Sequence, residues 1–344
     1  MVNDINFKYN KNYDTFCLQN CIYYILFSRK IENAELYINK SMSLIIEKQP
    51  ELDIRYYLDR NCYGVLPDYA KNVKCYSSDA DTYDIFQGNL RELAKNREII
   101  VGVDSYFLPH LPFYGTSHGL HSVILKGYDE RTEKVKIVDW VDPWYYEGDI
   151  GLKAFLDSRE SSNEDDGGMF SNIPIKNRWQ EVYLETWDGK LEQLIKGQII
   201  LSIEQFYRPG LPEGKGIVRG IDAIVHLYSI LEILRSLSKE GQERLLDRFH
   251  RVLYRSNHRR KFWGDFIDKI PSDYCIPILK EYAKEIHLLE KRWESLTYKL
   301  LMLKMRKKQG LLEEILAQMN SLIEIERESG DKLIEYVREM EWQY

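Results

Sequence analysis

The sequence predicts an α+β protein in which a mixed first part is followed by a mostly helical region. Three short segments rich in β-branched residues have the length and alternation of strands: 98–103, 121–128 and 135–138. After about Thr186, apolar residues recur at helical spacing almost to the end of the chain. We therefore expect one domain over residues 1–185 and an appended helical region over residues 186–344.

Local signals place the other elements. Asp14 and Thr15 are good N-cap residues before the apolar run 16–27, so Cys17 is expected in the first turn of a helix. The polar stretch 157–172, rich in Ser, Asp and Gly, predicts a mobile surface loop. A further strand is expected at 178–185. Helical patterns cover 31–47, 79–96, 191–206, 217–238, 240–256, 275–308 and 311–342.

Composition excludes several classes of protein. With 44% hydrophobic and 30% charged residues, the chain of 344 residues reads as a folded, globular protein. Its net charge of -6 argues against bulk nucleic-acid binding, which favours a basic chain. We see no signal peptide and no apolar run near the roughly 20 residues that a membrane span needs, so we expect a cytoplasmic protein without membrane contact.

The five cysteines do not indicate a disulfide framework or a structural zinc site. Their number is odd, they form no Cys-x-x-Cys pair, and no Cys–His pair has zinc-finger spacing. Free cysteines are commonly buried as small hydrophobic residues. We expect that role for Cys21, one turn after Cys17, and for Cys62, Cys75 and Cys275.

Cys17 is the candidate nucleophile. A thiol reacts as the thiolate, and both a helix N-terminus and a nearby imidazolium lower its pKa. His121 opens a strand whose hairpin partner ends at Asp139. Because a hairpin folds back on itself, the end of the second strand lies beside the start of the first. The pattern therefore predicts a catalytic triad in which His121 is the base and Asp139 orients it.

The order of these motifs resembles a known family. A helix-borne Cys is followed by His-Ser-Val-Ile-Leu-Lys-Gly-Tyr-Asp and then by Val-Lys-Ile-Val-Asp. Over about residues 10–150 the chain resembles papain-like cysteine enzymes of the bacteriocin-leader peptidase type. It resembles more closely the N-terminal domain of the butirosin-type acyltransferases. The amide-forming papain-like enzyme of closthioamide-type polythioamide biosynthesis is a related alternative.

The resemblance implies a papain-like fold, with Cys on a helix and His and Asp on an antiparallel sheet. It assigns Cys17 as nucleophile, His121 as base and Asp139 as orienting acid. Peptidases of this type often carry the acid in an Asp-Pro pair, which makes Asp142 the alternative acid. They also place a Gln shortly before the Cys, where this chain has Lys11 and then Asn12. Asn12 is therefore a candidate oxyanion donor, with the Cys17 backbone N–H as the second.

The resemblance also implies a function. Butirosin-type acyltransferases move an acyl group from a carrier-protein thioester to an amine. We thus expect an amide-forming acyltransferase of natural-product biosynthesis that passes an acyl or peptidyl group through acyl-Cys17. The expected partners are an acyl or peptidyl carrier protein and a small amine or diamine. The expected cofactor is the carrier's phosphopantetheine thioester, with none on the enzyme.

The sequence offers no P-loop pattern, so amide formation requires an acyl donor that is already activated. A thioester meets that requirement. Two alternatives stay open. The same triad could serve a cysteine peptidase or a thioesterase, and the domain could instead be a non-catalytic papain-like binding protein.

A basic stripe is the candidate docking surface for the carrier. On a helix, one face would carry Arg244, Arg248, Arg251, Arg255 and Arg259. Carrier proteins are typically acidic and present a phosphate, which suits such a surface. The alternatives are a solvated face or pairing with the acidic C-terminal helix.

Two other groups near the triad have structural and functional interpretations. His110 and His118, in the loop before His121, are typical solvated loop residues, although His118 is the second candidate base. An aromatic cluster follows the acid and forms either core packing or a wall for an acyl chain: Trp140, Trp144, Tyr145 and Tyr146.

Overall fold

The protein divides into two compact units. The computed structural model describes residues 16–48, 54–57, 64–141, 144–166, 170–210, 216–306 and 310–342. Unit 1 comprises residues 1–39 and 61–190, and unit 2 comprises residues 40–60 and 191–344. The expected α+β class is confirmed, with antiparallel sheets and a helical C-terminal region. The units divide close to the expected residue 185, but residues 40–60, expected in the first domain, belong to unit 2.

Unit 1 is built on a six-stranded sheet with the order β3-β8-β4-β5-β6-β7, in which all neighbouring strands are antiparallel. Its strands are β3 (Val73–Tyr76), β4 (Glu98–Asp104), β5 (Leu120–Asp129), β6 (Lys134–Val141), β7 (Trp144–Gly151) and β8 (Trp179–Val182). Its helices are α1 (Cys17–Ser28), α2 (Thr82–Ala94) and α3 (Leu152–Glu160), with 3-10 turns η2 (Ala34–Leu36), η4 (Pro67–Asn72) and η5 (Ser105–Phe107).

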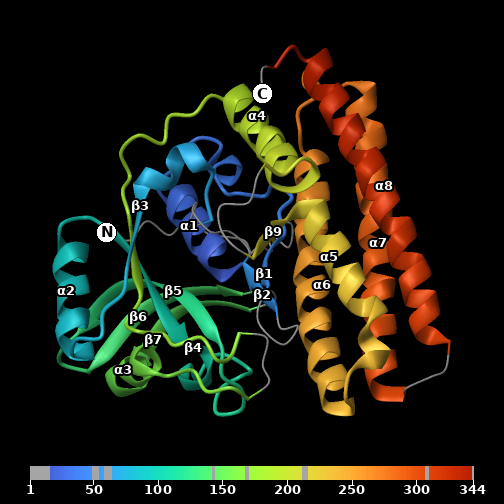
Figure 1. The fold of residues 1–344 in the computed structure, drawn as a ribbon. Coiled ribbons are helices and arrows are strands. Elements are labelled where there is room, and N and C mark those ends of the chain that lie inside the picture. Colours follow the sequence, from blue (N-terminus) through green and yellow to red (C-terminus); the bar gives the residue numbers. More distant parts are fainter. Residues whose placement is uncertain are drawn as a thin grey trace. The chain divides into compact units, whose positions relative to one another are not determined.

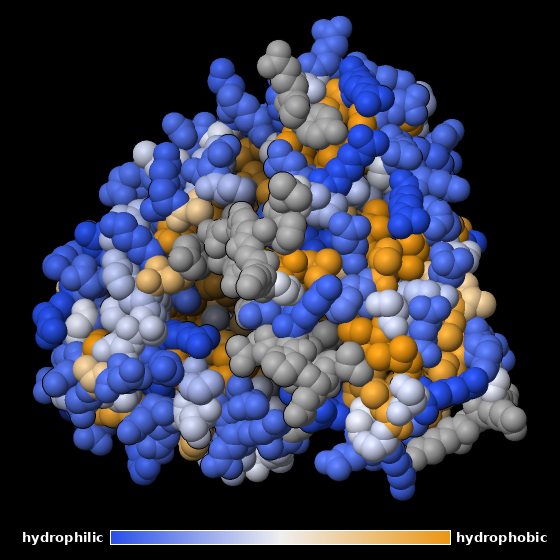
Figure 2. Space-filling model, in the orientation of Figure 1, coloured by the Kyte–Doolittle hydropathy of each residue, from blue (hydrophilic) through white to orange (hydrophobic). Residues whose placement is uncertain are grey.

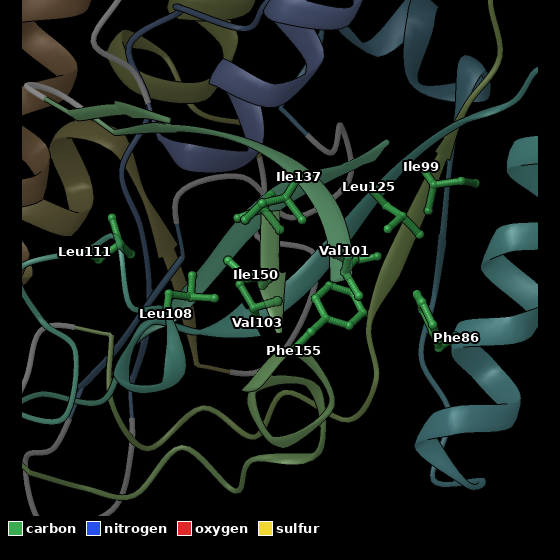
Figure 3. Packing of buried hydrophobic residues seen from close by; sticks show 12 residues of the cluster. Phe86, Ile99, Val101, Val103, Leu108, Leu111, Leu125, Ile137, Ile150 and Phe155 are labelled. Carbon is green, nitrogen blue, oxygen red and sulfur yellow. The ribbon is translucent and has the colours of Figure 1, made fainter. Parts of the chain in front are cut away.

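Alternation along the strands gives this sheet two buried faces. Side chains two residues apart share a face, and one face of β4 and β5 packs with Phe86 of α2 and Phe155 of α3 (Figure 3). The intervening residues Ile100 and Ile124 are also buried and point to the opposite face. Helix α1 packs against that face, along β5 and β6 (Figure 1).

Helix α1 is tied to its surroundings at both ends. Near its start, the Gln19 side-chain amide donates to the carbonyl oxygens of Asn39, at 2.7 Å, and Gly64, at 3.4 Å. A Cβ atom on Gly64 would lie 2.8 Å from Gln19 Cγ, so this close approach requires glycine. At the other end, Arg29 forms an ion pair with Glu98 of β4. These contacts fix where the helix start, and hence Cys17, lies.

Unit 2 combines a small sheet with long helices. Its strands, in the order β2-β1-β9, are β1 (Ile45–Lys48), β2 (Ile54–Tyr57) and β9 (Ile217–Arg219). Its helices are α4 (Leu191–Ser202), the π-helical turn η6 (Ile203–Tyr207), α5 (Gly220–Glu232), the 3-10 turn η7 (Leu234–Ser236), α6 (Lys239–Ile267), α7 (Pro277–Arg306) and α8 (Leu311–Glu339). Helix α7 packs against both α6 and α8 (Figure 1).

The surface of the long helices mixes polar and apolar residues. Figure 2 shows hydrophobic side chains exposed between hydrophilic ones over the C-terminal helices. On α7, Tyr298 and Met305 are 59% and 72% exposed. None of the helices in the described ranges is long and apolar enough to cross a membrane.

Three expected elements are wrong in part. The helix expected over 31–47 is a 3-10 turn followed by strand β1, because its apolar residues pack into two different units. The loop expected over 157–172 begins inside α3, which continues to Glu160. The helix expected from residue 217 starts with strand β9, which pairs with β1. The N-cap of α1 is Phe16, while Asp14 and Thr15 lie outside the described residues.

Among the described glycines, Gly220 leaves the least room for an added side chain. We expect Gly220→Ala to lower the free energy of unfolding by about 3 kcal/mol or more, measured by urea denaturation. Its φ is +54°, and a Cβ there would lie 2.0 Å from the Phe206 carbonyl oxygen. Gly310→Ala is the matched control: its φ is +84°, but a Cβ would meet nothing within 4 Å, so we expect a loss of only about 1–2 kcal/mol. Equal losses in the two variants would contradict this account.

Candidate active site

Cys17 is the first residue of helix α1. Phe16 is the extended N-cap, and the first helical hydrogen bond runs from the Asn20 N–H to the Phe16 carbonyl oxygen at 2.9 Å. The expectation that Cys17 lies in the first helical turn is therefore confirmed. The first N–H groups of a helix lack partners within the helix and carry partial positive charge. As a residue, Cys17 is partly exposed.

The β5–β6 hairpin brings His121 and Asp139 together, as its pattern predicts. The register pairs Ile124 with Val138. His121, three residues before Ile124, and Asp139, one residue after Val138, therefore lie at the same end of the strand pair. His121 Nε2 lies 2.7 Å from Asp139 Oδ1, and the two side chains are 9% and 1% exposed. The structure thus places Asp139 on His121, whereas the alternative acid, Asp142, lies outside the described residues.

The Cys17 thiol lies within hydrogen-bonding reach of the His121 imidazole. Because His121 Nε2 binds Asp139, Nδ1 is the nitrogen left for the thiol. Asp139 is acceptor-only when ionised, so it fixes the tautomer in which Nε2 carries the proton and Nδ1 can accept one. The three predicted triad residues therefore form one continuous hydrogen-bonded series.

Their pKa values favour the ionised pair. Burial alone would raise the pKa of Cys17, but the hydrogen bond and charge of His121 outweigh it and bring that pKa below its usual 9.0. Burial would lower the pKa of His121, yet the Asp139 carboxylate and the Cys17 thiolate raise it to about 10. The pKa of Asp139 falls to about 2 because His121 and His110 outweigh its burial. Both shifts favour the thiolate–imidazolium pair over the neutral thiol and imidazole.

Ser122 is a site residue that the sequence analysis missed. Its side chain hydrogen-bonds Cys17 and lowers the pKa of that thiol. Its backbone oxygen accepts the Cys21 thiol at 3.4 Å. Its place next to His121 was the signal that could have found it. Cys21 is 1% exposed, which confirms the expected core role.

Both histidines of the β4–β5 loop differ from the solvated side chains that the sequence predicts. His110 is 7% exposed and places Nε2 at 2.7 Å from Asp139 Oδ2, on the oxygen that His121 does not use. His118 is 15% exposed and binds Asp104 through Nδ1 at 2.7 Å. Asp104 is fully buried. Each histidine is withdrawn from water because a buried carboxylate accepts from it.

The aromatic cluster divides between core and site. Trp140 is buried, at 2% exposure, and stacks obliquely on Tyr23. Tyr146 stacks on His110 with ring centroids 4.1 Å apart. Tyr145 donates to Glu147. The Trp144 side chain lies outside the described residues.

The remaining site expectations concern the other cysteines and the oxyanion donor. Cys75 and Cys275 are half-buried rather than fully buried. Cys62 and the candidate oxyanion donor Asn12 lie outside the described residues. The backbone N–H of Cys17, the other expected oxyanion donor, lies in the first turn of α1.

The arginine stripe lies on α6 but is not exposed along its length. Arg244 is exposed and Arg248 and Arg251 are half-buried, whereas Arg259 is buried. The Arg255 side chain lies outside the described residues. The neighbouring Arg260 is buried too, and it donates to Glu326 of α8 at 2.6 Å. The Arg260–Glu326 contact pairs this segment with the acidic C-terminal helix. Among the stripe residues whose side chains are described, Arg244, Arg248 and Arg251 keep exposed surface.

The described part of the chain contains no candidate metal site. There, no group of three or more His, Cys, Asp or Glu side chains is arranged to hold a metal ion. His110, His121 and Asp139 are instead joined by direct hydrogen bonds.

The reactivity of Cys17 should follow from its lowered pKa. We expect iodoacetamide to alkylate Cys17 at neutral pH before Cys21 and Cys75, because only the thiolate reacts. Burial raises the pKa of Cys21 well above the usual value and that of Cys75 to about 12. Since a thiolate exists above its pKa, the rate at Cys17 rises with pH through a midpoint below 9.0. Peptide mapping by mass spectrometry at a series of pH values measures it.

His121→Gln is the matched test of the cause. Without the imidazolium, burial dominates, and the midpoint of Cys17 alkylation moves above 9.0. An unchanged midpoint would mean that His121 does not activate the thiol.

Comparison with known proteins adds no assignment to this geometry. No protein-family model matches the chain, and no curated protein matches it either.

Proposed function

We propose that the protein is a cysteine-dependent acyltransferase that forms an amide bond. An acyl or peptidyl group passes from a carrier-protein thioester to Cys17 and then to a small amine. The observation that carries the proposal is the hydrogen-bonded series Cys17–His121–Asp139, in which the thiol pKa is lowered and the imidazole pKa is raised. Nucleophilic catalysis requires such an activated thiol beside an oriented base.

The first half-reaction uses the resting ion pair. The Cys17 thiolate attacks the thioester carbonyl, and the N–H groups at the start of α1 stabilise the oxyanion that forms. The bond from the carbonyl carbon to the carrier sulfur breaks. The His121 imidazolium gives its Nδ1 proton to the departing thiolate. The products are acyl-Cys17, neutral His121 and the free carrier thiol.

The second half-reaction restores the resting state. The amine attacks acyl-Cys17, and neutral His121 takes the proton that the nitrogen loses. The carbon–sulfur bond to Cys17 breaks, releasing the amide and the thiolate. Asp139, at 1% exposure, stabilises the imidazolium at both stages.

The exposure of the site favours transfer over hydrolysis. Cys17 is partly exposed, whereas His121 and Asp139 are 9% and 1% exposed. A base with little access to solvent water can act on an amine bound at the thiol, and water competes less for the acyl-enzyme.

A carrier protein suits the accessible half of the α6 stripe. Arg244, Arg248 and Arg251 lie at spacings of four and three residues, which puts them on one side of the helix. We propose that these arginines meet the acidic surface or the phosphate of the carrier. Arg259 and Arg260 take no part, because they are buried.

An acyl-enzyme is the direct test of the function. We expect intact-mass analysis after incubation with an acyl-carrier protein to show an acyl adduct on Cys17. Added diamine should then remove the adduct and yield the amide. Cys17→Ala should show no adduct and should lower amide formation by at least about 10³-fold. Free acid as the sole product, with and without diamine, would replace transfer by hydrolysis. The absence of any adduct with several carriers would contradict acyl-Cys17 chemistry.

Charge reversal tests the docking surface. We expect Arg244→Glu and Arg248→Glu to raise KM several-fold for a carrier-bound acyl group but not for a small acyl-pantetheine thioester, which lacks the carrier surface. Lys280→Glu, an exposed change on α7, is the charge-matched control. Equal effects on both substrates would place the arginines outside carrier recognition. Steady-state kinetics on the two substrates distinguish these outcomes.

A further inference from the structure

Asp139 is held by two histidines rather than one. Its Oδ1 lies 2.7 Å from His121 Nε2, and its Oδ2 lies 2.7 Å from His110 Nε2. All three side chains are nearly buried, at 1%, 9% and 7% exposure. An ionised carboxylate only accepts hydrogen bonds, so both imidazoles donate an Nε2–H to it. The triad of the proposed function is therefore part of a series of four side chains.

His110 supplies the hydrogen bond that the second carboxylate oxygen of Asp139 would lack if only His121 bound it. A buried carboxylate with one hydrogen bond has an oxygen that is neither solvated nor paired, which is costly. That oxygen would favour protonation of Asp139 or rotation of its carboxylate away from His121. The His110 N–H removes both tendencies, and it contributes to the low pKa of Asp139.

The fold holds His110 in this position from β7. Tyr146 is the strand partner of Asp139, and its ring stacks on the His110 ring at 4.1 Å and an interplanar angle of 11°. The Tyr146 hydroxyl donates to the Asp149 carbonyl oxygen at 2.9 Å, and the Tyr146 ring lies over Gly148. A Cβ on Gly148 would lie 2.7 Å from that ring, so only glycine permits this arrangement.

We propose that His110 is a positioning residue of the site, which locks the Asp139 carboxylate in the ionised, His121-facing orientation and so maintains the Cys17–His121 ion pair. The inference rests on the proposed function only in taking Cys17 as the reactive thiol. It requires no particular acyl donor. His110 touches Asp139 and acts on the thiol only through Asp139 and His121.

Two substitutions separate the hydrogen-bond donor from the ring. His110→Phe keeps a ring against Tyr146 and removes the donor. His110→Gln keeps an N–H donor near the position of Nε2 and removes the ring. We expect His110→Phe to lower kcat by about 10- to 100-fold with little change in KM, the range that a hydrogen bond to a charged group gives. We expect His110→Gln to remain within a few-fold of wild type.

Cys17 alkylation gives a readout that does not depend on acyl transfer. In His110→Phe, a less firmly held carboxylate stabilises the imidazolium less. The pKa of His121 then falls, the pKa of Cys17 rises, and the alkylation midpoint moves to higher pH. In His110→Gln the midpoint should stay near that of wild type. A purely structural role predicts the reverse order: a near-normal Phe variant and an impaired Gln variant.

Imidazole NMR of the wild-type protein keeps the test independent of variant folding. With ¹⁵N-labelled histidine, we expect two downfield Nε2–H protons that exchange slowly with water, from His110 and His121. A wild-type midpoint in His110→Phe, or only one such proton in wild type, would overturn the role of His110. If wild-type Cys17 forms no acyl adduct but the midpoints shift as expected, the proposed function fails while this inference stands.

Discussion

A carboxylate that is almost completely buried needs a partner for each oxygen, and Asp139 takes both of its partners from imidazoles. This requirement links elements that are distant in sequence. The hairpin β5–β6 supplies His121, the loop before β5 supplies His110, and β7 supplies the ring that supports it. Since Asp139 raises the pKa of His121, and His121 lowers that of Cys17, the reactivity of the thiol depends on how this one carboxylate is held.

The helix that carries the thiol is positioned by a different set of contacts. Gln19 joins the start of α1 to Asn39 and Gly64, and Arg29 joins its end to Glu98. These bonds place a helix N-terminus, with its partial positive charge, beside an imidazolium. Burial opposes the thiolate, and the hydrogen bond and charge of His121, together with the Ser122 hydrogen bond, overcome it. Burial therefore has two effects at this site. It disfavours the charged thiolate, and it strengthens the attraction between the thiolate and the imidazolium.

Polar residues in both units are held by pairing rather than by solvation. In unit 1, Asp104 accepts from His118 and from Ser161 at 2.6 Å. In unit 2, Glu326 accepts from Arg260 and from Trp293 at 2.8 Å. A periodic pattern of arginines or a polar loop therefore does not by itself indicate a wet surface, because buried polar groups persist where a partner is available.

The sequence by itself determined the α+β class, the helix start at Cys17 and the hairpin that joins His121 to Asp139, because these depend on local periodicity and on a short turn. Only the tertiary structure decided which residues outside that hairpin reach the site. His110 gained its role from packing that no local pattern encodes, whereas Ser122 follows His121 directly in the sequence. Long-range pairing also decided residues 45–47, which were expected in a helix but form a strand that pairs with β9, about 170 positions away. Such long-range pairing is set by the whole fold, so it overrides local propensity.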